Sequence, residues 1–244
     1  MLKGDFHSHT VFSRHPFHER FGILDGIDTI DSMASTAARK GIDAIAITDH
    51  NVVLNEKIAK DYSKKYNITV IPGVEIHLNG KEFLAIGIQE YPKTNFEEIK
   101  DAVHEQDGIL IACHPFDPLG RGRKDFENFD AIEAHNGYSK SDFDKVYPIA
   151  KSKNKPMVCG SDAHSVQQLG YTYCLVDANP EADSIIAAIK KNKVEPIKKI
   201  TPQKIFLEYY FRKYGKLEAL QNKKYREALL PAARERKTSV AIEA

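Results

Sequence analysis

Two histidines separated by a single residue, His7 and His9, lie in the segment 5–10 near the start of the sequence. On an extended strand, side chains two positions apart leave the same face, so both imidazoles are expected to point into one space. Converging ring nitrogens are costly in a dry core, but they suit zinc, manganese or iron as ligands. A single pair of this kind is weak evidence for a metal site, because scattered histidines produce such pairs by chance.

Further ligand-type residues recur near the ends of apolar runs along the chain. These residues are His50, Glu75, His114, His135, Asp162 and His164. In addition, His15 lies in the polar loop after His9, close enough for that loop to fold back over the same site. Recurrence at several positions favours a shared metal cluster over scattered surface histidines.

The hydrophobic pattern alternates between short apolar runs and amphipathic helical segments. The continuous run 44–48 predicts a strand that is buried on both faces, as strands of parallel sheets are. Segment 26–40 predicts a helix, because its apolar residues recur on one face and Gly41 follows it. Counting the strands followed by ligand-type residues, together with the last strand, gives seven β/α-like units. Because ligand-type residues follow five or more of the expected strands, a closed barrel explains them better than an open sheet, which gathers its site at one crevice.

The chain has 244 residues, of which 42% are hydrophobic, enough for the core of one large domain. Its 35 basic and 34 acidic residues give a formal net charge of +1, which disfavours a nucleic-acid-binding surface over the whole chain. The first expected strand begins directly at the amino terminus, and no run of about 18 apolar residues occurs. A soluble cytoplasmic protein without a membrane partner is therefore expected.

Three cysteines, Cys113, Cys159 and Cys174, lie inside apolar strand-like runs. An odd number argues against a disulfide framework, so buried reduced thiols are expected. Cys113 directly precedes His114, and neighbouring side chains of a strand leave opposite faces. We therefore expect Cys113 to face away from the metal ligands.

Beyond residue 197 the sequence changes to an aromatic segment, 205–211, followed by many charged residues. We expect residues 1–197 to form the barrel and residues 198–244 to form a peripheral helical extension, with fraying over 233–244. The lysines and arginines of this extension are expected on a solvated helix face rather than on a surface for nucleic acid or a protein partner.

The order and content of these motifs resemble the PHP family, named for polymerase and histidinol phosphatase, over residues 5 to about 195. Members of that family fold as a distorted seven-stranded (β/α)7 TIM-like barrel with a trinuclear metal centre. The resemblance therefore implies an α/β fold of this kind here, with three divalent metal ions that could be zinc, manganese or iron.

The resemblance also assigns the ligands ion by ion. The first ion would take His7, His9, Glu75 and Asp162. The second would take Glu75, His114 and His135, and the third would take His15, His50 and His164. With Glu75 shared, each ion keeps open coordination positions for hydroxide and substrate oxygens, whereas a purely structural cluster would be closed.

A centre of this type implies a metal-dependent phosphoesterase, which hydrolyses phosphate esters with a metal-bound hydroxide. Asp162 and His164 are expected in the catalytic centre, together with Arg14. The charge that develops on phosphate also needs protein cations, and Arg14, Arg121 and Arg123 lie in loops beside ligand-bearing strands. We expect these three arginines to contact the substrate phosphate, with Arg14 as the first choice.

Three functions are compatible with the sequence. The favoured one is hydrolysis of a small phosphorylated molecule or nucleotide. An exonuclease or RNA-end nuclease with the same centre is less favoured, because the net charge is near zero. A non-catalytic PHP binding module is the third, and the complete ligand set argues against it. The sequence does not identify the substrate, the metal or the oligomeric state.

Overall fold

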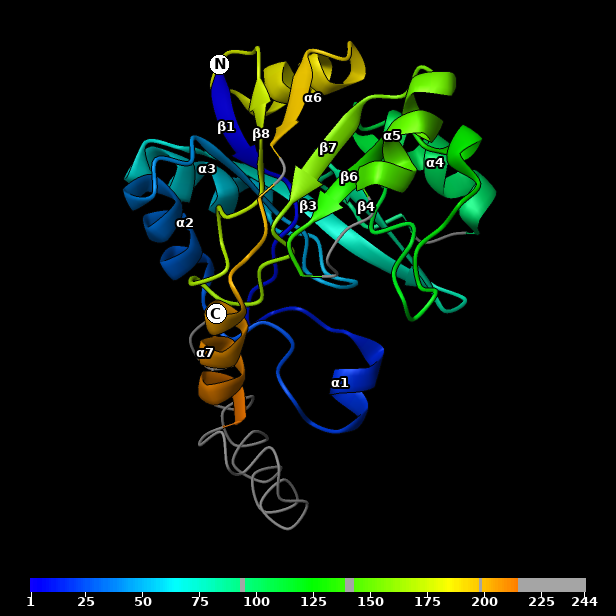
Figure 1. The fold of residues 1–244 in the computed structure, drawn as a ribbon. Helices are drawn as coiled ribbons and strands as arrows, with labels where there is room; N and C mark the ends of the chain where they lie inside the picture. Colours follow the sequence, from blue (N-terminus) through cyan, green and yellow to red (C-terminus); the bar gives the residue numbers. More distant parts are fainter. Residues whose placement is uncertain (93–94, 139–142, 198, 215–244) are drawn as a thin grey trace.

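The computed structural model describes residues 1–92, 95–138, 143–197 and 199–214. Within these ranges the chain forms nine strands in one sheet and seven α-helices (Figure 1). The strands are β1 (Leu2–Asp5), β2 (Ala44–Ile47), β3 (Thr69–Leu78), β4 (Lys81–Ile86), β5 (Ile109–Ala112), β6 (Ala131–Asn136), β7 (Met157–Gly160), β8 (Tyr173–Val176) and β9 (Val194–Ile197). The helices are α1 (Pro16–Arg20), α2 (Ile30–Arg39), α3 (Glu56–Tyr66), α4 (Phe96–His104), α5 (Phe143–Ser152), α6 (Ala182–Lys190) and α7 (Gln203–Tyr214).

The sheet runs in the order β7-β6-β5-β4-β3-β2-β1-β8-β9. Strands β1, β2 and β3 pair in parallel, as do β5, β6 and β7, whereas β4 is antiparallel to both β3 and β5. An isolated parallel bridge from Ser8 to Ala163 joins the segments that follow β1 and β7. The expected α/β barrel-like fold is therefore confirmed, with a sheet that is nearly closed. Strict alternation of seven strands with seven helices is not what the sheet shows, because β4, β8 and β9 form antiparallel pairs.

The side chains of strand β2 alternate between two apolar clusters. Ala44 and Ala46 pack in one apolar cluster with residues of the other strands and of α6. Ile45 and Ile47 belong to a second cluster, which includes Met33 of α2. All four β2 side chains are buried, as the continuous apolar run predicted.

Helix α2 begins at Ile30, four positions later than the sequence pattern predicted. Its amino-terminal cap is Thr29, whose side chain accepts a hydrogen bond from the Ser32 backbone N–H at 3.2 Å. Gly41 follows the helix with a φ of +66°, as expected for a glycine after a helix end. The segment before Thr29 bends at Asp25, Gly26 and Asp28 and enters the region where the ligand-type residues gather.

Helix α7 lies at the end of the sheet to which the β6 and β7 arrows point, below the strands in Figure 1, as does α1. Most residues of α7 are exposed or half-buried, but Tyr209 and Lys213 are buried. The Tyr209 hydroxyl donates a hydrogen bond to the Asp25 carbonyl oxygen at 3.2 Å. The predicted fraying over 233–244 lies outside the described residues. None of the described helices has the length and apolar character needed to cross a membrane.

Candidate metal centre

The carboxylate of Glu75, in the middle of β3, lies at the centre of the candidate site and is 1% exposed. Its Oε2 atom is 3.1 Å from His7 Nε2, 3.2 Å from His9 Nε2 and 3.2 Å from His50 Nε2. Its Oε1 atom is 2.9 Å from His114 Nε2. One carboxylate therefore contacts imidazoles delivered by the segments after β1, β2 and β5. As predicted, both histidines of the first motif point to the same place.

Asp162, which follows β7, completes a first group of ligand atoms. Its Oδ1 lies 3.1 Å from His9 Nε2 and 3.5 Å from His7 Nε2. The four ligand atoms of Asp162, His7, His9 and Glu75 lie within 4.8 Å of one another. Two atoms bound to one zinc ion at a tetrahedral angle are separated by ~3.4 Å, so the observed spacings suit a shared ion. Asp162 also has a φ of +51°, a strained backbone conformation of the kind found at functional sites.

A second group joins Glu75, Cys113 and His114. The Cys113 Sγ atom lies 3.3 Å from Glu75 Oε1, so the expectation that Cys113 faces away from the ligands is wrong. Strand β5 ends at Ala112, and His114 has a φ of +25°, which breaks the alternation of faces that the expectation assumed. All three cysteines are buried free thiols, as predicted.

A third group contains Asp25, which the sequence analysis missed, with His9 and His164. Asp25 is 1% exposed. Its Oδ1 lies 3.4 Å from His164 Nε2, and its Oδ2 lies 3.9 Å from both His9 Nδ1 and His50 Nε2. Asp25 therefore takes the position between His50 and His164 that the sequence analysis gave to His15.

Gly26 explains how Asp25 reaches the histidines. A Cβ atom on Gly26 would lie 2.4 Å from the Thr10 carbonyl oxygen, so only glycine allows this backbone approach to the end of the first motif. The Ser13 hydroxyl then donates a hydrogen bond to Asp25 Oδ2 at 2.6 Å and fixes the carboxylate. An acid followed by glycine, after a loop that carries histidines, is the sequence signal that could have identified Asp25.

His15 lies beside His50, one of its two predicted partners, but its Nε2 atom belongs to a different group of ligand atoms. Its Nε2 atom is 3.2 Å from Glu82 Oε1, and it forms a separate group with Glu82 and His77. The His15 ring still meets the His50 ring edge-on, with centroids 4.6 Å apart. The His15 group therefore adjoins the main cluster without being part of the third predicted set.

His135 is not brought to Glu75 and His114. The register of β6 against β7 shifts between Glu133 and His135, so one extra residue of β6 changes which side chains face the site. The His135 Nε2 atom instead donates a hydrogen bond to the Lys199 carbonyl oxygen at 2.6 Å. Within the described residues, no group able to hold a metal includes His135.

Glu133 and Asn136 occupy the face that His135 was expected to occupy. Glu133 Oε1 lies 3.0 Å from His7 Nδ1, so this carboxylate orients the ring whose other nitrogen faces Glu75. The side-chain amide of Asn136 donates to Glu133 Oε2 at 3.0 Å and to Asp162 Oδ2 at 3.2 Å. Glu133 and Asn136 therefore orient the ligands His7 and Asp162 through hydrogen bonds.

Two of the three predicted phosphate-binding arginines lie beside the cluster. Arg14 is exposed, and its backbone N–H donates a hydrogen bond to the His50 carbonyl oxygen at 3.0 Å. Arg121 is already engaged: its Nε donates to Asp117 Oδ2 at 3.0 Å, and its Nη1 lies 3.4 Å from Glu82 Oε2. Of these two arginines, Arg14 is therefore the more exposed.

Arg123 is directed to other partners. Its guanidinium forms a two-point ion pair with Asp125, with distances of 2.9 and 2.6 Å, and lies 3.4 Å from the centroid of the Phe96 ring. Lys213 of α7 is a cation that the sequence analysis did not identify near the site. Its Nζ donates a hydrogen bond to the Asp25 carbonyl oxygen at 3.0 Å, and burial lowers the pKa of Lys213 to about 8.

Burial and neighbouring charges shift the pKa values of the titratable groups in the cluster. Burial alone would lower the pKa of His9, but the neighbouring carboxylates of Asp162 and Glu75 outweigh it and raise that pKa to about 10. The same competition with Glu75 raises the pKa of His114 to about 9. For His50 burial dominates and lowers the pKa to about 3. Carboxylates at this position therefore stay ionised and attract cations, either protons on the rings or metal ions.

Unsatisfied nitrogen atoms show whether the donor set fits metal ions. Within the described residues, His9 Nε2 is fully buried and makes no hydrogen bond, although carboxylate oxygens of Glu75 and Asp162 lie 3.2 and 3.1 Å away. A buried ring nitrogen in this situation is costly unless it binds something. Imidazole and carboxylate atoms at these spacings suit zinc, manganese or iron, so the residues present fit a metal cluster.

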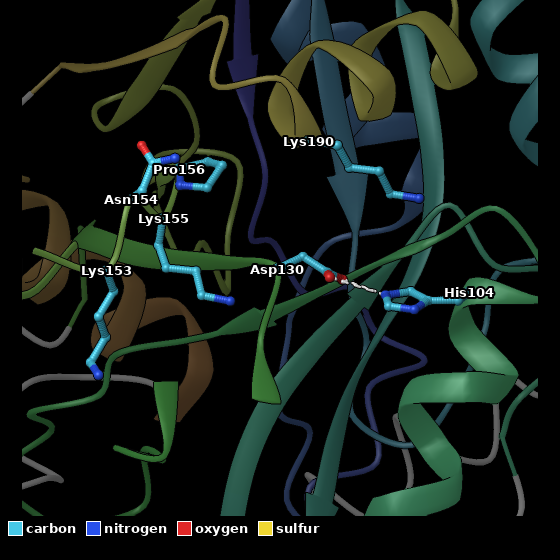
Figure 2. A pocket seen from close by; sticks show the side chains of 7 residues that line it. All are labelled: His104, Asp130, Lys153, Asn154, Lys155, Pro156 and Lys190. Carbon is cyan, nitrogen blue, oxygen red and sulfur yellow. Dashed lines mark hydrogen bonds and ion pairs between the residues drawn. The ribbon is translucent and has the colours of Figure 1, made fainter. Parts of the chain in front are cut away.

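A cavity of about 440 Å³ lies away from this cluster (Figure 2). Asp130 directly precedes β6 and Pro156 directly precedes β7, so the cavity is at the amino ends of these strands, whereas the ligands follow carboxyl ends. His104 is exposed and lies 2.9 Å from Asp130, as Figure 2 shows. This cavity is therefore distinct from the metal site, and His104 is a surface residue.

Comparison with known proteins gives matches in sequence and in fold. A sequence family described as PHP-associated matches residues 142–194. An uncharacterized protein of Methanocaldococcus jannaschii is 30% identical over 144 residues, which cover 57% of this chain and 84% of that protein.

Solved structures show the same fold. A two-domain protein of Bacteroides vulgatus that contains a predicted PHP-like metal-dependent phosphoesterase superposes with a TM-score of 0.60 and 20% identity, over 87% of this chain and 70% of that chain. A protein of Bifidobacterium adolescentis, assigned as a metal-dependent phosphoesterase, gives a TM-score of 0.52 and 15% identity, over 86% of this chain and 96% of that chain. With its motifs, its nearly closed sheet and its cluster around Glu75, this chain belongs to the PHP family.

Proposed function

We propose that this protein is a metal-dependent phosphoesterase that hydrolyses a small phosphorylated molecule at a centre of three divalent metal ions. The observation that carries the proposal is the position of Glu75, whose two oxygens lie within 3.2 Å of four imidazoles while it is 1% exposed. A buried arrangement of this kind is costly without cations between the groups.

The ligand groups of the structure suggest how three ions would be held. His7, His9, Glu75 and Asp162 would hold the first, and Glu75 with His114 would hold the second, beside Cys113. Asp25 and His164, with His9 or His50 at their edge, would hold the third. When bound, such ions act as Lewis acids on phosphate oxygens and lower the pKa of a water molecule, which makes it a nucleophile near neutral pH.

The chain itself would supply orientation and charge. Glu133 holds the His7 ring through Nδ1, and Asn136 ties Glu133 to Asp162, so the ligand positions are fixed before substrate arrives. Arg14, exposed on the loop anchored to His50, would form a forked contact with the substrate phosphate. Asp162 and His164 act in this proposal as ligands in the catalytic centre.

The loop after β5 favours a small substrate over a nucleic-acid strand. Two of its arginines, Arg121 and Arg123, are paired with Asp117 and Asp125. Their charges are largely neutralised, so they do not provide the row of available cations that a phosphate backbone needs. This pairing weakens the case for a nuclease and also for Arg121 and Arg123 as phosphate ligands.

A substrate panel tests the proposal. Protein loaded with manganese would be assayed for phosphate release from phosphomonoesters, for opening of cyclic nucleotides and for cleavage of short oligonucleotides. We expect hydrolysis of at least one small phosphate ester, with loss of turnover after chelation and recovery after manganese is restored. Cleavage of oligonucleotides alone would replace the proposal with the nuclease. Hydrolysis that is unaffected by chelation would contradict a metal-dependent mechanism.

A further inference from the structure

A group of ligand-type side chains outside the three proposed ion positions lies beside them, and the phosphoesterase reaction does not use it. The group contains His15, His77 and Glu82, whose ligand atoms lie within 4.8 Å of one another. Glu82 Oε1 is 3.2 Å from His15 Nε2 and 3.2 Å from His77 Nδ1. Two imidazoles therefore converge on one carboxylate oxygen.

The β3–β4 hairpin fixes two of these side chains. His77 and Glu82 are paired directly across the two strands, so their side chains leave the same face at close range. His15 comes from the loop before α1, where it also acts as the helix cap. The fold thus brings His15 to a pair of side chains that the hairpin holds together.

Burial makes this arrangement costly without a further partner. Glu82 is fully buried, and within the described residues its Oε2 atom makes no hydrogen bond. Arg121 Nη1 lies 3.4 Å from that oxygen but outside hydrogen-bond geometry, and His114 Nε2 lies 3.8 Å away. A buried carboxylate stays ionised only when cations surround it, and burial alone would raise its pKa. Hydrogen bonds from His15 and His77 instead lower the pKa of Glu82 to about 2.

We propose that His15, His77 and Glu82 bind a fourth divalent cation of the zinc class. Two imidazoles and one carboxylate, with a remaining position open, form a donor set that zinc commonly accepts. The 3.2 Å separations are close to the ~3.4 Å expected between two ligands of one tetrahedral zinc ion. The proposal concerns metal binding and does not depend on the phosphoesterase activity.

Binding at this position would alter the cap of α1. The His15 Nδ1 atom accepts a hydrogen bond from the Phe17 backbone N–H at 3.2 Å, which requires an unprotonated Nδ1. Coordination through Nε2 places the ring proton on Nδ1, so that hydrogen bond is lost. The fourth ion would therefore be coupled to the conformation of the loop that carries Arg14 and α1.

Zinc counting in matched variants tests the proposal. Chelated protein would be dialysed against the lowest free zinc concentration that saturates the parent, and the bound zinc would be counted by elemental analysis. His77→Gln and His15→Gln should each bind one zinc ion fewer than the parent, and the double variant should also lose only one. His104→Gln, a change of the same type at the exposed histidine paired with Asp130, should bind as many as the parent.

Thermal unfolding of each variant shows whether it is folded, and two independent single variants guard against a folding defect in either one. Equal zinc counts in the parent and in both folded single variants would overturn the proposal. Loss of two ions in the double variant would also overturn it, because the two histidines would then belong to different ions.

Discussion

At the level of single residues, three imidazoles carry protons that a metal ion must displace. Charge interactions with carboxylates, Asp162 first for His7, raise the pKa of His7 well above its ordinary value, and they raise that of His9 to about 10 and that of His114 to about 9. At neutral pH the metal-free rings are therefore protonated, whereas His50, with a pKa of about 3, is not.

Metal binding should consequently release about three protons per chain at pH 7, and the apparent affinity should rise with pH at least until His114 and His9 lose their protons, at about pH 9 and 10. Calorimetry in buffers of different ionisation enthalpy measures the number released. No proton release at pH 7, or an affinity that falls between pH 6 and 8, would contradict the assignment of these histidines as ligands.

Asp25 belongs to the ligand groups of the structure but is absent from the ligand set that the sequence implied. Asp25→Ala should remove one metal ion and lower turnover by at least ~100-fold. Loss of a residue that only orients a ligand can already cost this much, and Asp25 is proposed as a direct ligand. Asp177→Ala, at an exposed aspartate, is the matched control and should leave both unchanged. Elemental analysis and phosphate release measure the two effects. Parental metal content in a folded Asp25→Ala protein would show that Asp25 is not a ligand.

Strand alternation predicted the shared face of His7 and His9, and it failed where the strands are irregular. The register shift in β6 moved His135 away from the site, and the left-handed backbone at His114 turned Cys113 toward it. Neither irregularity has a sequence signature in a short apolar run. Alternation of faces therefore held at His7 and His9, which follow β1, and failed at these two irregular positions.

Among the elements, the loop between β1 and α1 carries the proposed phosphate contact. Arg14→Ala should lower turnover by roughly 30- to 1000-fold, corresponding to about 2 to 4 kcal/mol of transition-state stabilisation, with metal content unchanged. Arg14→Lys should recover part of this loss, because it keeps the charge but not the fork. Arg123→Ala, which removes the contacts with Asp125 and Phe96, should affect stability more than turnover. Parental kcat/KM in Arg14→Ala would show that Arg14 is a solvated loop charge.

The turn at Gly26 positions Asp25 through close backbone contact. Gly26→Ala places a Cβ atom 2.4 Å from the Thr10 carbonyl oxygen, so the segment must shift, at a cost of about 1 to 3 kcal/mol. We expect lower thermal stability together with loss of one metal ion. In Gly120→Ala, where open space surrounds the new Cβ but φ is +71°, stability should fall while the metal count stays the same. A Gly26→Ala protein with full metal content would contradict this role of the turn.

Contacts between residues that are distant in the sequence were not predicted by the sequence analysis. Glu82 meets His77 because β3 and β4 form a hairpin, and the Asn79-Gly80 pair at its turn, with φ values of +52° and +73°, is the signal that could have predicted it. The contact of α7 with Asp25 has no comparable signal, since an aromatic and charged helix fits a peripheral position equally well. The helical character of α7 was nevertheless predicted correctly.

At the scale of the whole molecule, the alternation of apolar runs with helical segments predicted an α/β barrel-like sheet, and this is confirmed. Strand direction was not encoded in that alternation, so antiparallel β8 was counted as if it belonged to a regular β/α unit. The nearly closed sheet gathers ligands from β3 and from the segments after β1, β2, β5 and β7 at one end. The cluster is therefore a property of the whole barrel, and no single strand could form it.

The central claim is that the cluster around Glu75 makes turnover dependent on metal. The most direct measurement is phosphate release by chelated protein as manganese is added back, for the parent, for Glu75→Gln and for Glu97→Gln, whose glutamate is exposed on α4. The parent and Glu97→Gln should regain activity together. Glu75→Gln should stay folded and remain on the order of 1000-fold slower, because it loses the several kcal/mol that the ions supply. Full activity in the chelated parent, or parental activity in Glu75→Gln, would contradict the claim.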